Sequence, residues 1–156
     1  MLRTISRSVC VARRKWQLPA CTAGVSALEF AIVAPVFLAM ATGAFKFGLA
    51  MTQYLALTNA AGQGATTFAL SRGTTTSYTT MTTAITNAAP GLTAGSITKT
   101  VSVNGVACGD NTACGTALVA GATATVTVTY PCDLTVMGVN FKSGCTLSAQ
   151  SAQMIQ

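Results

Sequence analysis

A long apolar run, residues 25–57, follows a short basic segment in this chain. Its charge-free centre is residues 30–45, and the apolar character continues past Lys46 to Met51. A helix needs about 20 apolar residues to cross a bilayer. Residues 30–51 reach that length if the Lys46 side chain extends its amine toward the membrane surface. The sequence therefore predicts one membrane-spanning helix with Lys46 near the outer face.

Charge is concentrated before the apolar run. The 156 residues include nine Lys and Arg, three Asp and Glu, and no His. Positively charged flanks stay in the cytoplasm, so we expect the N-terminus inside and everything after about residue 55 outside. Because five of the nine bases, and nearly all of the net positive charge, belong to the leader, the charge gives no indication of nucleic-acid binding. The bases of the leader are Arg3, Arg7, Arg13, Arg14 and Lys15.

The composition also argues against catalysis. Three carboxylates and no histidine leave almost nothing for general acid–base chemistry. Hydrolases, kinases and histidine-ligated metal enzymes are therefore disfavoured, and neither a P-loop nor a dinucleotide-binding glycine motif is present. We expect a protein that is not an enzyme, with no cofactor, no metal and no small-molecule substrate.

The leader ends in the sequence GVSALEF, residues 24–30, in which a glutamate follows a glycine by five positions. This order resembles the class III signal of prepilins and pseudopilins. The wider segment, residues 24–48, is similar to the N-terminal part of the TadE-like pilus-assembly family, which carries the pattern A-x-E-F-A-x-x-x-P. Here that pattern is met by Ala27, Glu29, Phe30, Ala31 and Pro35.

The resemblance implies a non-catalytic, minor pilin-like component of the bacterial Tad/Flp-type (tight adherence) pilus machinery. It implies cleavage after Gly24 by a prepilin peptidase, which makes Val25 the new N-terminus. The implied partners are the peptidase, other pilin-like subunits, inner-membrane pilus assembly proteins and membrane lipid. The implied location is the bacterial inner membrane, crossed once, with the C-terminal domain in the periplasm. Whether the protein also enters the pilus stays open.

Glu29 is the first candidate for a role in assembly. The resemblance implies that its carboxylate meets the freed Val25 amine of a neighbouring subunit. A carboxylate in a medium of low dielectric is costly alone and tolerated when paired. The alternative interpretation is a hydrated Glu29 at headgroup level, without a partner.

An ordinary secretory signal or membrane anchor is the alternative for the whole segment. Cleavage after Ala39-Met40-Ala41 would release a secreted, disulfide-stabilised binding domain, and an uncleaved chain would tether it. The long basic region and Glu29 inside the apolar entry both weigh against this alternative.

We expect the helix, residues 25–72, to continue beyond its membrane span, which is about residues 30–51. Pro35 lies within it, and the small pairs Ala39/Gly43 and Ala44/Gly48 are a weak signal of close helix packing. A stripe at helical spacing is predicted to face the core of an outer domain. That stripe consists of Met51, Tyr54, Leu55, Thr58, Ala61, Gly62, Ala65, Phe68 and Ala69.

Residues 74–156 read as an outer α+β domain after the leader, residues 1–24, and the long helix. We predict a short helix at 77–88 and strands at 97–103, 122–130 and 145–150, the last extending as far as 155. Three strands with one apolar face need a cover. The predicted fold is therefore pilin-like α+β: a long N-terminal transmembrane helix packed on a small three-stranded antiparallel sheet, with a short second helix.

The cysteines fit this topology. Cys10 and Cys21 lie in the predicted cytoplasmic leader and should stay reduced. Four outer cysteines allow three pairings. We expect Cys108–Cys114 and Cys132–Cys145, because both close local loops, and we disfavour zinc because the spacing lacks a C-x-x-C knuckle. Asp110 and Asp133 read as isolated acids in loops.

Overall fold

The structure is a computed structural model that describes residues 23–136 and 138–156, with side chains from residue 27 onward. The predictions for the leader, including Cys10 and Cys21, lie outside the described residues. The chain divides into two compact units, Met1–Val36 and Phe37–Gln156. The second unit contains the whole outer domain.

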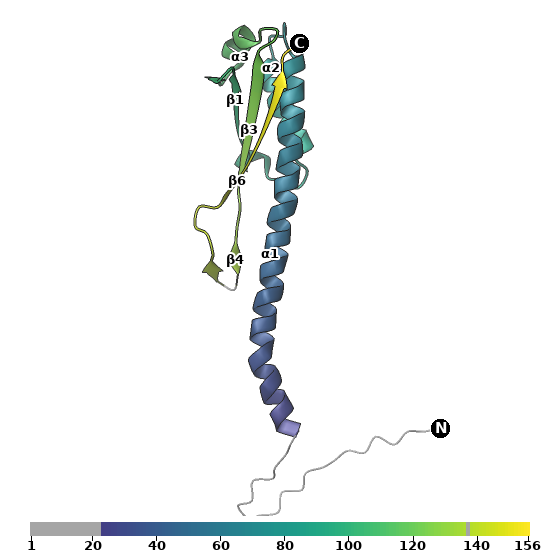
Figure 1. Cartoon of the computed structure of the whole chain (residues 1–156), viewed down its shortest axis with the longest axis vertical. Coiled ribbons are helices and arrows are strands. Elements are labelled where there is room, and N and C mark those ends of the chain that lie inside the picture. Colours follow the sequence, from purple (N-terminus) through teal and green to yellow (C-terminus); the bar gives the residue numbers. More distant parts are fainter. Residues whose placement is uncertain (1–22, 137) are drawn as a thin grey trace, which may run out of the picture. The chain divides into compact units, whose positions relative to one another are not determined.

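The structure is α+β, as predicted, and begins with a long apolar helix (Figure 1). Its helices are α1 (Ala23–Leu70), α2 (Ser77–Ala88), the single 3-10 turn η1 (Ala94–Ser96) and α3 (Asn111–Ala117). Its strands are β1 (Thr98–Val103), β2 (Val106–Cys108), β3 (Thr123–Pro131), β4 (Thr135–Val136), β5 (Val139–Asn140) and β6 (Thr146–Met154).

The main sheet has the order β2-β1-β3-β6, and all its neighbours are antiparallel. The prediction of three strands was therefore wrong by one, because β2 adds an edge strand beside β1. Asn104 and Gly105 form the connecting turn with φ of 49° and 84°. Two positive φ values are what a two-residue hairpin turn requires, and Asn-Gly supplies them at little cost.

The core lies between the sheet and helices α1 and α2. On β3, Ala124, Val126 and Val128 are completely buried, while the intervening threonines face outward at least in part. Met81 and Ile85 contribute the buried face of α2. The alternation of small and β-branched residues with threonine thus places one face of the sheet against the helices.

The predicted core stripe of α1 was wrong at its start. Met51, Tyr54, Leu55 and Thr58 are exposed, and Gly62 is half-buried. The sheet and α2 cover the helix only from residue 57 onward, and small residues at 60 and 64 allow the close approach. The predicted stripe began too early on the helix and omitted the buried Leu57, Ala60 and Gly64. The buried residues of this face are Leu57, Ala60, Ala61, Gly64, Ala65, Phe68 and Ala69.

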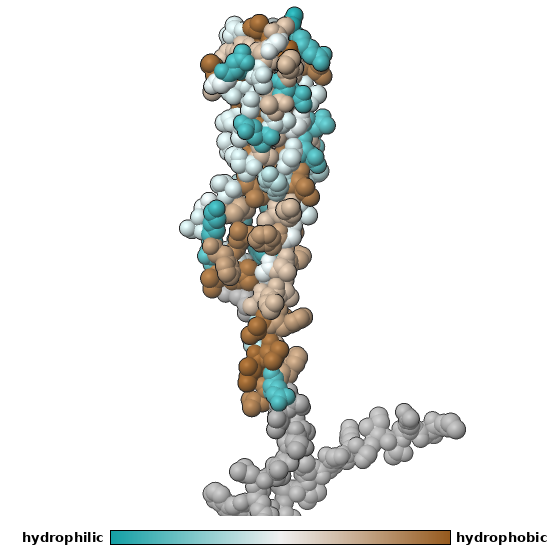
Figure 2. Space-filling view, viewed as in Figure 1, coloured by the Kyte–Doolittle hydropathy of each residue, from teal (hydrophilic) through white to brown (hydrophobic). Residues whose placement is uncertain are grey.

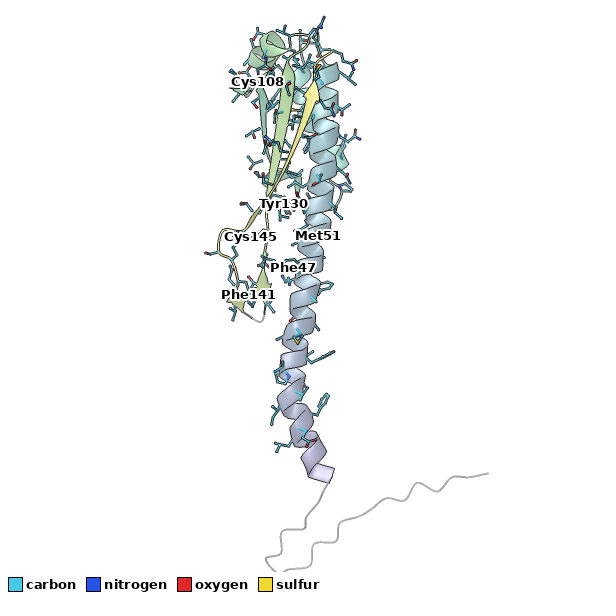
Figure 3. All side chains as sticks on the ribbon, viewed as in Figure 1. Phe47, Met51, Cys108, Tyr130, Phe141 and Cys145 are labelled. Carbon is cyan, nitrogen blue, oxygen red and sulfur yellow. A yellow bond between two sulfur atoms is a disulfide. The ribbon has the colours of Figure 1, made fainter. Side chains whose placement is uncertain are left out.

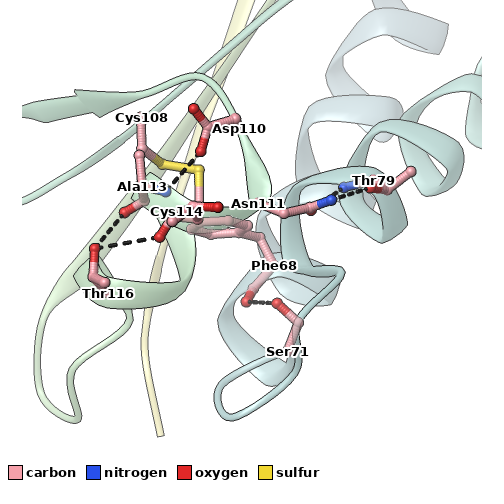
Figure 4. Close-up of a disulfide and its surroundings, with 10 residues drawn as sticks. Phe68, Ser71, Thr79, Cys108, Asp110, Asn111, Ala113, Cys114 and Thr116 are labelled. Carbon is pink, nitrogen blue, oxygen red and sulfur yellow. Dashed lines mark hydrogen bonds between the residues drawn. A yellow bond between two sulfur atoms is a disulfide. The ribbon is translucent and has the colours of Figure 1, made fainter.

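The Cys108–Cys114 disulfide joins β2 to α3 at the edge of this core (Figure 4). Cys114 is completely buried and belongs to the same core cluster as Phe68. Asp110 caps α3 by accepting a hydrogen bond from the Ala113 backbone N–H at 2.7 Å. The prediction of an isolated loop acid was therefore wrong for Asp110, whose carboxylate satisfies an otherwise unpaired helix-terminal N–H.

A pair of side-chain hydrogen bonds holds α3 against α2. The Asn111 amide nitrogen donates to the Thr79 hydroxyl at 2.7 Å, and the Thr79 backbone N–H donates to the Asn111 Oδ1 at 3.0 Å. These bonds and the disulfide fix the connection between β2 and β3. Local contacts therefore hold α3 to both β2 and α2 (Figure 4).

Candidate functional site

The N-terminal part of α1 exposes a long series of large apolar side chains. We call residues 28–55 the apolar segment. Exposed apolar residues on this scale mark a membrane or protein contact rather than ordinary surface. Examples with more than two thirds of the side chain exposed are Phe30, Ile32, Phe37, Met40, Phe45 and Phe47.

One helix in the described part of the chain, at Ala27–Leu70, is long and apolar enough to cross a membrane, judged by length and composition. In the outer domain polar and apolar residues are mixed, whereas apolar colour dominates the N-terminal half of α1 (Figure 2). The apolar segment is therefore the candidate functional site, and its chemistry is that of contact with lipid or other apolar helices.

The residues of the predicted processing and assembly site all lie on α1. Gly24 and Val25 belong to its first turn, Glu29 is exposed one turn later, and Pro35 lies inside the helix. Glu29 is the one acidic residue of α1. The next charged residue along the helix is Lys46. The structure thus places a single carboxylate at the entrance of the apolar segment.

The small residues predicted to favour helix packing are not used by the outer domain to contact α1 closely. Ala44 and Gly48 are exposed, while Ala39 and Gly43 are half-buried. A methyl group added at Gly43 or Gly48 would meet no atom within 4 Å. A methyl group is therefore accommodated at either position, and the packing role stays a prediction.

Lys46 has a partner that the sequence analysis missed. Its Nζ lies 2.9 Å from Asp133 Oδ2, in the segment that follows β3. The prediction of an isolated acid was therefore wrong for Asp133 as well. Hydrogen bonds from the Thr135 side chain, from Lys46 and from the Thr135 backbone N–H lower the pKa of Asp133 to about 2. The two charged residues are 87 positions apart, and no local pattern connects them.

Asp133 belongs to a disulfide-closed segment, residues 132–145, which we call the 132–145 loop. It is bounded by the Cys132–Cys145 disulfide, and together with Cys108–Cys114 this is the pairing expected from the sequence. The loop contains β4 and β5, which form a small hairpin separate from the main sheet. Lys46 thus ties the apolar segment to this loop.

The acidic, cysteine and histidine side chains offer no metal centre in residues 23–136 and 138–156, where no three of them cluster. The four cysteines of the outer domain are joined in the two disulfides.

Comparison with known families now bears on this geometry. A family model described as TadE-like protein matches residues 24–66. This segment is TadE-like. The match begins at Gly24 and covers the whole apolar segment, and it confirms the resemblance found in the sequence. Neither the curated proteins nor the solved structures contain a match to the chain. A TadE-like segment on a helix able to span a membrane indicates a component related to the Tad pilus.

Proposed function

We propose that this protein is a non-catalytic, pilin-like component of Tad/Flp-type pilus assembly, held in the bacterial inner membrane by α1. The observation that carries the proposal is the extent of the TadE-like match, residues 24–66. It starts at the glycine of the predicted processing site and covers the apolar side chains that the outer domain leaves exposed. An exposed apolar helix of this length is supported by lipid before assembly and by other helices after it.

Processing and pairing are linked in this proposal. Cleavage after Gly24 by a prepilin peptidase creates an ammonium group at Val25, four residues before Glu29. In the apolar layer between helices, the Glu29 carboxylate of one subunit pairs with the Val25 amine of a neighbour. Breaking such a pair strands a charge in a medium of low dielectric, so the pair selects correctly processed subunits.

The proposed topology follows from charge. The basic leader stays in the cytoplasm, α1 crosses the membrane over about residues 30–51, and the outer domain folds in the periplasm, where its disulfides are stable. Its partners are the prepilin peptidase, other pilin-like subunits and inner-membrane assembly proteins. The small pairs Ala39/Gly43 and Ala44/Gly48, both C-terminal to Pro35, are the proposed sites of close helix approach.

The test is N-terminal sequencing of the mature protein from the native envelope, beside a Gly24→Ala variant. We expect a start at Val25 in the native protein and an intact leader in the variant. Because the variant lacks the new amine, it should remain in the membrane but fail to co-isolate with pilus components. An outer domain with both disulfides intact in the variant shows that folding is unaffected.

Two outcomes would contradict the proposal. A native protein that starts after Ala41 would be a secreted disulfide domain with an ordinary signal peptide. A native protein that retains Met1 would be a tethered domain on a plain anchor. Either result would remove the Val25 amine and with it the role proposed for Glu29.

A further inference from the structure

The 132–145 loop extends from the main sheet along α1, at the level of residues 43–47 (Figure 3). Part of its backbone is paired within the loop itself. The Cys132 N–H donates to the Cys145 carbonyl at 3.0 Å, and Val136 pairs with Val139 across the hairpin. Pairing of backbone groups within a segment lowers the cost of placing that segment against the acyl chains, where no water can bond to them.

An apolar cavity of about 300 Å³ separates the loop from α1. The side chains of Phe47 from the helix and Phe141 from the loop both line it, as Figure 3 helps to locate. Gly43 widens the cavity, because it has no side chain. The remaining lining residues are Lys46, Leu134 and Val136.

The loop also exposes apolar side chains. Phe141 is 73% exposed and Val139 is 61% exposed. Asp133 and Lys142 are the charged residues of positions 132–145. Because Asp133 pairs with Lys46, the loop presents the charge of Lys142 next to an exposed aromatic ring. An aromatic residue beside a cation is typical of segments at the boundary between headgroups and acyl chains.

The position of the loop decides which occupant fits it. A span that starts at Phe30 needs about 20 residues to cross the hydrocarbon, so it ends near residue 50. A loop that lies beside residues 43–47 is then at the depth of the outer leaflet.

We propose that the 132–145 loop inserts its Phe141 and Val139 side chains into the outer leaflet of the membrane, with Lys142 toward anionic headgroups. This inference rests on the proposed function in one respect, that α1 crosses the membrane. The loop then serves as a second membrane contact, which fixes the height of the outer domain and the rotation of α1. Lys46 and Asp133 neutralise each other where helix and loop enter the interface.

Depth-dependent fluorescence quenching tests the proposal on the full chain in lipid vesicles. The single tryptophan, Trp16, is first replaced by Phe. Three variants then carry one tryptophan each: Phe141→Trp in the loop, Phe37→Trp in the apolar segment and Val106→Trp on β2. Val106 is 70% exposed, and the strand register places it at the opposite end of β3 from the loop, which makes it the matched control.

We expect lipids brominated near the headgroup end of the acyl chain to quench Phe141→Trp at least about threefold more than Val106→Trp. Phe37→Trp should be quenched most by lipids brominated deep in the chain. In vesicles with anionic lipid, the quenching of Phe141→Trp should increase, and Lys142→Gln should remove the increase while Lys142→Arg keeps it.

The outcomes separate the inference from the proposed function. If Phe37→Trp is quenched and Phe141→Trp behaves like Val106→Trp, α1 spans the membrane and the loop proposal is wrong. If Phe37→Trp is also unquenched, the proposed span itself fails. If Phe141→Trp is quenched only after tenfold dilution of protein in lipid, a second copy of the chain covers the loop, and this too overturns the proposal.

Discussion

Gly64 shows how one residue sets the distance between α1 and its neighbours. A Cβ atom at this position would lie 2.5 Å from Cγ1 and 2.8 Å from Cδ1 of Ile85, and 3.6 Å from Cγ1 of Val126. The first two distances are too short for carbon atoms. The absence of a side chain at residue 64 therefore lets α2 and β3 approach the helix together.

We expect Gly64→Ala to lower the free energy of unfolding of the outer domain by about 1–3 kcal/mol, because Ile85 must move or the helices must separate. Thermal unfolding of the full chain in detergent micelles, followed by circular dichroism, measures the change. Gly62→Ala is the matched control in the same helix, since a methyl group there meets no atom within 4 Å. The control should gain up to about 1 kcal/mol from helix propensity. Equal melting temperatures for the two variants would contradict the close-packing argument.

At the scale of elements, the Lys46–Asp133 pair holds the 132–145 loop against α1, and it should show in the titration of Asp133. Because the folded pKa, about 2, lies below the ordinary value of 3.8, the contact is fully present above about pH 4. It is lost as the pH falls from about 4 toward 2. Acid should therefore loosen the loop while the buried core of the main sheet, which contains no carboxylate, is retained.

Carbon-13 NMR of the Asp133 carboxyl group in micelles measures this titration directly. Lys46→Gln should raise the midpoint above 2 but leave it below 3.8, because Thr135 still donates its hydrogen bonds. Lys142→Gln is the control, because Lys142 is a cation of the same loop but is not the salt-bridge partner of Asp133. This variant should leave the midpoint of the Asp133 titration unchanged. A native midpoint near 3.8 would show that the contact does not form in solution.

The helices and strands of the outer domain show which features can be predicted from the sequence. The helix at 77–88 and the strands β1, β3 and β6 were predicted to within a few residues of their ends, because each depends on a local period of apolar residues. The β1–β2 hairpin was missed although Asn104-Gly105 is a strong turn signal. The cap of α3 was missed although Asp110 is a common capping residue.

The candidate site also has features that the sequence predicts and features that it does not. The apolar segment and the entry at Gly24 to Glu29 were visible in the sequence, since they consist of consecutive residues. The contact of Lys46 with Asp133 and the cavity beside Phe47 were not visible, because they join residues nearly ninety positions apart. Only the path of β3 and the closure of the Cys132–Cys145 disulfide bring them together.

At the scale of the whole molecule, charge and redox chemistry both assign the leader and the outer domain to different compartments. The five bases of the leader should keep residues 1–24 in the cytoplasm, where thiols stay reduced. The outer domain depends on two disulfides, which persist in an oxidising compartment. Both arguments support the proposed topology, in which the apolar segment crosses the membrane and the two ends of the chain lie on opposite sides.

Thiol labelling with a membrane-impermeant maleimide tests this topology in the Gly24→Ala variant, which should retain its leader. With the outer membrane opened, the exposed turn residue in a Thr75→Cys variant should be labelled at once. Cys10 and Cys21 should be labelled only after the inner membrane is permeabilised, and Cys10→Ser with Cys21→Ser should remove that signal. Labelling of the leader from outside would reverse the orientation, since it would require the five bases to cross the membrane against the potential that normally retains them.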